Sequence, residues 1–179
     1  MSATEHRLVE AATRLIAFEG GTINYTKLLK LLYIADRESL RRNHAAITGD
    51  HYVSMNAGPV LSHAYDLIKG DAKSEIWSQH VSQKQAYNVE LLALPAHRTI
   101  SEEDKAILDE VYSTYGHMTY GQLIDLVHTY PEWKDPGGSS ITIPIRSVLR
   151  GCGYEDDAAK EISDATESIM GVHRLLGVA

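Results

Sequence analysis

The chain has 179 residues, of which 44% are hydrophobic and 23% charged, and its formal net charge is -7. These proportions are those of a globular protein rather than a disordered or membrane-spanning chain, and the length suffices for one hydrophobic core. A net negative charge argues against a large phosphate-binding face, so we do not expect nucleic acid as a partner. We expect a single domain over residues 1–179, with no membrane segment.

The N-terminus and the cysteine content bear on the cellular compartment. Residues 1–7 contain no charged region that leads into an apolar run, so no secretory signal is expected. Cys152 is the single cysteine, which excludes an internal disulfide and fits a reducing environment. The sequence therefore predicts a cytoplasmic protein.

Apolar spacing predicts helices over most of the chain. Asn24 is a suitable N-cap for the second helix, and Gly70 is a suitable stop for the third, which we expect to begin at Pro59 because its missing N–H is harmless there. The second helix carries two adjacent apolar stripes and is predicted to be central. The predicted helices cover residues 4–18, 25–43, 59–69, 101–115, 120–129, 145–150 and 155–176.

Two segments between the third and fourth helices resemble strands. Residues 76–81 and 87–92 are predicted to form a hairpin joined across 82–86, and residues 52–55 have the alternation of a short strand. The predicted fold class is α+β, mainly α: a compact domain of about seven helices around a central helix, with one small β-hairpin.

Motifs for metal, nucleotide and hydrolase chemistry are missing from the sequence. The nine histidines lack the close spacing of a ligand set, so we expect neither a metal nor a cofactor. No P-loop, G-x-S-x-G or dinucleotide fingerprint occurs. An enzyme remains one hypothesis, with His128, Asp50 or Cys152 as its candidate catalytic groups.

The segments 27–36, 47–60 and 64–66 together form a pattern that resembles the Panacea antitoxin domain, a family that includes SocA-like proteolytic adaptors and phage-associated proteins. Their core is a K-L-L-K-L-L-Y helix followed by G-D-H-Y and later by G-P-V. Residues 126–133 are similar to the family's later segment, a helix that ends in His and is followed by Pro and Trp. The positions that the resemblance assigns to the family scaffold are Lys30, Tyr33, Gly49, Gly58, Pro59, Tyr65, His128 and Trp133.

The resemblance implies an antitoxin that neutralises a cognate protein toxin by direct binding, with the toxin encoded by an adjacent gene. A proteolytic adaptor that delivers the bound toxin to a protease is the alternative within binding proteins. The chain departs from the family pattern near residues 54–57, where Ser54 or Met55 replaces the usual Ala and Ala57 replaces an aromatic residue. The candidate partner-binding residues are Arg37, Arg41, Asp50, Tyr52, Ser54, Met55 and Asn56.

Overall fold

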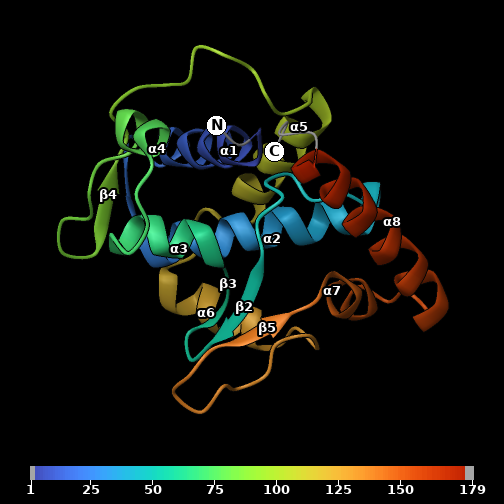
Figure 1. Cartoon of the computed structure of the whole chain (residues 1–179). Coiled ribbons are helices and arrows are strands. Elements are labelled where there is room, and N and C mark those ends of the chain that lie inside the picture. Colours follow the sequence, from blue (N-terminus) through green and yellow to red (C-terminus); the bar gives the residue numbers. More distant parts are fainter. Residues whose placement is uncertain (1–2, 176–179) are drawn as a thin grey trace.

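The computed structural model describes residues 3–175, and the side chains of residues 3–168. Helix α2 (Tyr25–Asn43) runs through the middle of the molecule, surrounded by α1 (Ala3–Phe18), α5 (Glu102–Tyr115) and α6 (Tyr120–His128) (Figure 1). Every residue from 27 to 36 is buried, including two lysines and an aspartate. The prediction of a central helix packed on more than one side is confirmed.

The ends of α2 follow from local chemistry. The Asn24 side chain accepts hydrogen bonds from the N–H groups of Thr26 and Lys27, which satisfies two donors that the first turn leaves free. His44 closes the helix in a left-handed conformation with φ of 58°. The N-cap prediction is therefore confirmed.

A three-stranded antiparallel sheet lies below α2 in Figure 1, with strand order β3-β2-β5. It consists of β2 (Tyr52–Met55), β3 (Gly58–Leu61) and β5 (Ile141–Ile143). Residues of β2 are alternately buried and half-buried, as its sequence predicts. The predicted start of a helix at Pro59 is wrong, because Pro59 lies in β3 at the edge of the sheet, where a missing N–H is tolerated. Helix α3 (Ser62–Lys69) begins only after this strand.

The predicted hairpin of residues 76–81 and 87–92 is also wrong. Residues 75–80 form helix α4 (Glu75–His80), which begins where the Ser74 hydroxyl accepts the Trp77 N–H and packs against α1. Strand β4 (Asn88–Glu90) instead pairs with β1 (Thr22–Asn24). Short apolar runs do not distinguish strand from helix, and the true partner of β4 lies far away in the sequence. One isolated bridge, from Val81 to Leu91, joins the two predicted strands.

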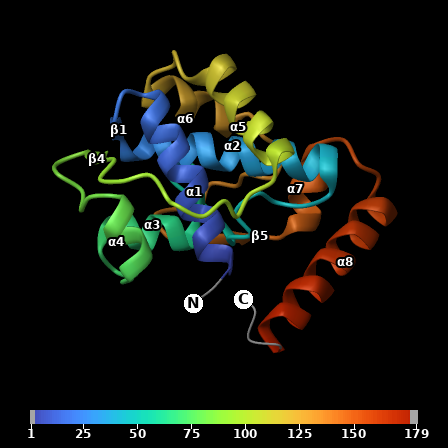
Figure 2. The same cartoon turned by 90° about the horizontal axis from the view of Figure 1, so that it is seen from above.

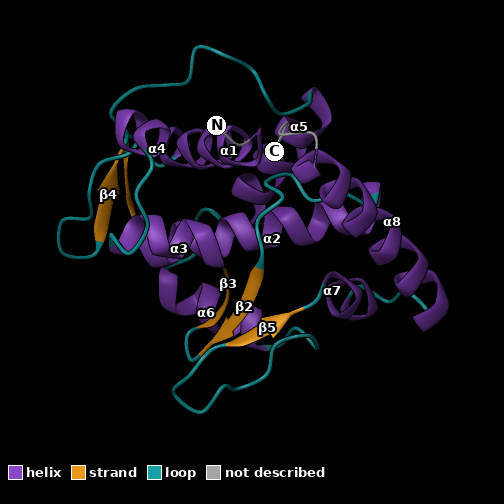
Figure 3. Cartoon of the chain, in the orientation of Figure 1, coloured by secondary structure: helices purple, strands orange, loops and turns teal. Residues whose placement is uncertain are grey.

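The C-terminal part contains α7 (Ile145–Gly151) and α8 (Asp156–Leu175), which pack on each other. Figure 2 shows α8 along one side of the molecule. Residue 176, the predicted end of the last helix, lies outside the described residues. The fold class is α+β and mainly α, as predicted, with eight helices among the described residues and the strands confined to two small sheets (Figure 3). None of these described helices has the length and apolar character needed to cross a bilayer.

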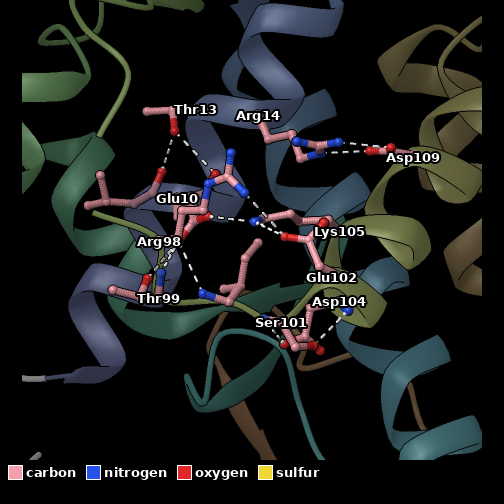
Figure 4. Close-up of polar contacts among 12 residues, drawn as sticks. Glu10, Thr13, Arg14, Arg98, Thr99, Ser101, Glu102, Asp104, Lys105 and Asp109 are labelled. Carbon is pink, nitrogen blue, oxygen red and sulfur yellow. Dashed lines mark hydrogen bonds and ion pairs between the residues drawn. The ribbon is translucent and has the colours of Figure 1, made fainter. Parts of the chain in front are cut away.

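Polar contacts attach α1 to α5 and to the segment before it (Figure 4). Arg14 forms two hydrogen bonds with Asp109, at 2.6 and 2.8 Å, and Glu10 accepts the backbone N–H groups of Thr99 and Ile100. At the start of α5, Ser101 and the third residue of the helix form a reciprocal capping box. These contacts join elements about 90 positions apart in the sequence and explain why the segment before α5 lies across α1.

Candidate functional site

The tip of the β2–β3 hairpin is held by two side chains, one at the end of α6 and one in the segment that follows it. The Trp133 indole N–H donates to the Met55 carbonyl at 3.0 Å, and His128 Nε2 lies 3.1 Å from the Asn56 carbonyl. The two rings stack on each other with their centroids 4.0 Å apart. His128 and Trp133 therefore hold the hairpin tip as a pair.

Lys30, on α2, holds the other strand of the hairpin. Its ammonium group is buried and donates to the Pro59 carbonyl at 2.9 Å. Burial lowers the pKa of Lys30 to about 7, because the charged form loses its hydration. The neighbouring Gly58 has φ of +97°, and a Cβ there would lie 2.6 Å from Val127 Cγ2 on α6. Only glycine allows the strand to approach α6 this closely.

A second contact joins α2 to the segment after α6 through a carboxylate. Tyr33 donates its hydroxyl to Glu132 Oε1 at 2.9 Å, and Arg37 Nε donates to the same oxygen at 2.7 Å. The Glu132 side chain has no exposed surface, and the Arg37 side chain is 15% exposed. Arg37 also donates to the Gly151 carbonyl and lies over the Tyr130 ring. Burial and the adjacent carboxylate raise the pKa of Tyr33 well above its ordinary value.

Asp50 provides the N-terminal cap that α3 lacks. Leu61 occupies the N-cap position and has no side-chain acceptor, whereas the Asp50 carboxylate accepts the N–H groups of His63 and Ala64 at 3.1 and 3.0 Å. It also accepts the N–H of His51 at 2.6 Å. Burial raises the pKa of Asp50 although these three donors favour the charged form. The Gly-Asp dipeptide of the motif is thus a cap supplied from outside the helix.

Asp36 attaches α2 to the start of β2. It accepts the N–H of Thr48 at 2.9 Å and the Thr48 hydroxyl at 2.5 Å, and the Tyr52 hydroxyl donates to it at 3.0 Å. Burial raises the pKa of Asp36 to about 6. Like Lys30, Asp36 is a buried charge with its hydrogen bonds made inside the chain, which is typical of structural polar groups.

We call the inward-facing contacts of Lys30, Asp36, Thr48, Asp50 and Glu132 the buried base of the hairpin. The outward surface of the hairpin differs from this buried base. Asn56 and Ala57 are exposed, Met55 is half-buried, and Ile141, next to Ser54 in the sheet, is 42% exposed. Because Ile141 pairs with Ser54, it points to the opposite face of the sheet from Met55. We call the other three residues the tip face: Met55, Asn56 and Ala57. Asn56 Oδ1 accepts the Gly138 N–H at 3.1 Å, so the loop before β5 steadies the tip face.

The structure separates the candidate partner-binding residues into two groups. Asp50, Tyr52 and Ser54 are buried, and Arg37 is largely covered, so these four make their contacts inside the chain. Arg41, Met55 and Asn56 keep surface for a partner. Arg41 lies in the last turn of α2, where it pairs with Glu38, whereas the other two belong to the tip face.

The three candidate catalytic groups also have internal contacts. His128 contacts the hairpin tip, and Asp50 caps α3. Burial raises the pKa of the Cys152 thiol, which disfavours the reactive thiolate, and the thiol donates to the Arg37 carbonyl at 3.9 Å. Among the residues that the structure describes, no three His, Cys, Asp or Glu side chains are placed to hold a metal ion.

Sequence reasoning missed three residues of the buried base: Asp36, Thr48 and Glu132. Glu132 had a visible signal, because Tyr33 and Arg37 are four positions apart and thus share one face of α2, ready for a common partner. The Asp36–Thr48 contact had no signal, because it joins two segments across a turn whose course the sequence does not show.

A comparison with known protein families bears on this arrangement of contacts. The model of the family described as "Antitoxin SocA-like, Panacea domain" matches residues 28–134, which is more than half of the chain. The chain belongs to this family. No curated protein and no solved structure matches it.

The Panacea match covers the buried base of the hairpin. It includes α2 from residue 28 on, the hairpin and the segment through Trp133, whereas β5, α7 and α8 lie beyond it. Of the scaffold positions, Lys30, Tyr33, Gly58 and Trp133 each contact an element distant in the sequence. These four positions of the Panacea pattern therefore have a packing role.

Proposed function

We propose that this Panacea protein is an antitoxin that neutralises a cognate protein toxin, encoded by an adjacent gene, by direct binding in the cytoplasm. Family membership supports the antitoxin role and implies a toxin in general. The proposal needs no catalytic residue, because an antitoxin acts by covering or restraining its toxin.

The observation that carries the proposal is the division of the hairpin into a fixed base and an exposed tip. Lys30 and Asp50 hold the base through contacts inside the chain, and Trp133 fixes the backbone of the tip by donating to the Met55 carbonyl. The tip face exposes apolar and amide groups on this rigid support, and interfaces favour such pre-ordered surfaces because little entropy is lost on binding. Residues 54–57 are also where the chain departs from the family pattern. We therefore place toxin contact at the tip face.

A growth experiment tests the antitoxin role. The adjacent open reading frame is expressed from an inducible promoter, alone and together with this chain. We expect growth arrest when it is expressed alone and recovery with the chain. A neighbour that is harmless alone, or arrest that persists with the chain present, contradicts the proposal.

The same cells distinguish neutralisation by binding from delivery to a protease. After synthesis is stopped, the amount of toxin is followed with and without the chain. A toxin whose half-life is unchanged or longer supports neutralisation by binding alone. A half-life that shortens only when the chain is present supports the adaptor alternative, with a protease as a further partner.

A further inference from the structure

A groove with a cationic rim lies between α3, α4 and the segment that follows α4. It has a volume of about 720 Å³. Its floor contains the apolar side chains of Leu67, Ile68, Trp77 and Val81. In Figure 1 α4 lies above α3 on the side of the molecule that carries β4, and both lie apart from the hairpin tip. The groove is therefore a surface separate from the tip face.

Three lysines stand on the rim of this groove: Lys69, Lys73 and Lys84. All three are exposed. Glu75 is the single carboxylate among the lining residues of the groove, so the rim carries a surplus of two positive charges. This local sign is opposite to the net charge of -7 of the whole chain.

The rest of the described surface shows why these lysines are unusual. Among residues 3–168, every arginine lies within ion-pair distance of a carboxylate, for example Arg14 with Asp109 at 2.6 Å and Arg42 with Glu110 at 2.7 Å. Within the same range, the exposed lysines without such a carboxylate are the three on the groove and Lys134. Among the described residues, three of the four exposed cations that lack a carboxylate partner therefore lie beside one apolar groove.

We infer that this groove binds a short acidic segment of a partner protein, with an apolar side chain on the floor and carboxylates against the lysines. The apolar floor favours a peptide over a nucleic acid, which requires a longer basic track along its phosphates. The volume lies in the range of sites that enclose small ligands, so it fits a few side chains rather than a whole domain face.

The rim is partly pre-ordered for this role. The Lys69 ammonium lies over two aromatic rings, 5.6 Å from the centroid of Tyr25 and 5.7 Å from that of Tyr65. These contacts restrict the long side chain without neutralising its charge. Lys73 and Lys84 approach from two different segments, so a bound peptide would meet cations on more than one side. The inference rests on this charge and shape and does not depend on the partner being a toxin.

Selection from a random twelve-residue peptide library displayed on phage tests the inference with the whole chain. We expect the enriched peptides to combine Asp or Glu with an aromatic or branched aliphatic residue. One enriched peptide is then synthesised with a fluorophore, and its dissociation constant is measured by fluorescence anisotropy. Raising the salt concentration from 50 to 500 mM should weaken binding several-fold, because exposed charge pairs are screened.

The variant that tests the rim is Lys73→Glu with Lys84→Glu, and its matched control is Lys134→Glu, an exposed lysine near the hairpin. Circular dichroism checks that both variants keep the fold of the wild type. We expect the double variant to weaken peptide binding about tenfold and the control to change it less than about twofold, given what exposed ion pairs contribute. No enrichment of acidic peptides overturns the inference, as does equal binding by the double variant. Competition by a single-stranded DNA of twenty nucleotides at the peptide's own concentration also overturns it.

Discussion

Replacing Gly58 by alanine tests the contact between the hairpin and α6. The structure gives two costs. A side chain at φ of +97° is strained, and its Cβ would lie 2.6 Å from Val127 Cγ2. The strain is about 1–2 kcal/mol, and overfilling a packed site adds about 1–3 kcal/mol. We therefore expect Gly58→Ala to lower the free energy of unfolding by about 2–5 kcal/mol.

Gly21→Ala is the matched control. Gly21 also has φ of +97°, but a Cβ there meets nothing within 4 Å, so only the strain remains. Unfolding in urea is followed by circular dichroism for both variants, with the slope of the transition checked for constancy. At a slope of about 2 kcal/mol per molar, the two midpoints should differ by about 0.5–1.5 M. Equal midpoints would refute the reasoning, because they would show that Val127 withdraws at no cost.

Three further predictions concern the buried groups. Burial lowers the pKa of Lys30 to about 7 in the folded chain, whereas the pKa in the unfolded chain is about 10.4. Between these two pH values the unfolded state binds more protons than the folded state, so stability rises with pH over this range. From pH 7 to 9 the free energy of unfolding of the wild type should rise by about 2 kcal/mol relative to that of Lys30→Met. Urea titrations of both proteins at the two pH values measure this difference. The same change with pH in both proteins would contradict the prediction. Tyr33→Phe removes a donor to the buried Glu132 carboxylate and should lower the free energy of unfolding by about 1.5–3 kcal/mol. The control is Tyr65→Phe, which should lower it by less than about 0.5 kcal/mol, because the Tyr65 hydroxyl has no partner among the described hydrogen bonds. Similar losses for the two variants would be inconsistent with the Glu132 contact. Because burial raises the pKa of the Cys152 thiol, it should react with a disulfide reagent at pH 7.4 more slowly than free cysteine, and a faster reaction would reopen the enzyme hypothesis.

The sequence was most informative where local signals agree. The apolar stripes of α2 and its Asn24 cap predict a helix that the structure contains, and the helices predicted over residues 101–115 and 120–129 correspond to α5 and α6, with Ser101 and Thr119 as their caps. In each of these the cap and the periodic apolar face indicate the same start, and the element is long enough to average out exceptions. The resemblance then led to the family that the chain belongs to.

The sequence was least informative where distant contacts decide the structure. Residues 75–80 form a helix that packs on α1, while β4 pairs with β1, and neither neighbour is visible in the local pattern. Pro59 is equally suited to a helix start and to an edge strand, and pairing with Ser54 decides between them. The same limit applies to Asp50 and Tyr52, whose polar tips resemble surface groups in the sequence but reach acceptors and donors inside the fold.

Titration calorimetry between the purified chain and the purified product of the adjacent gene tests the central claim most directly. We predict a saturable complex with a dissociation constant below about 1 μM. Ala57→Glu, which places a charge on the tip face, should weaken it at least about tenfold, whereas Ala106→Glu, at an exposed position on α5, should change it less than about twofold. The absence of any complex with the wild-type chain would contradict neutralisation by direct binding, and equal binding by both variants would contradict the placement of the contact at the tip face.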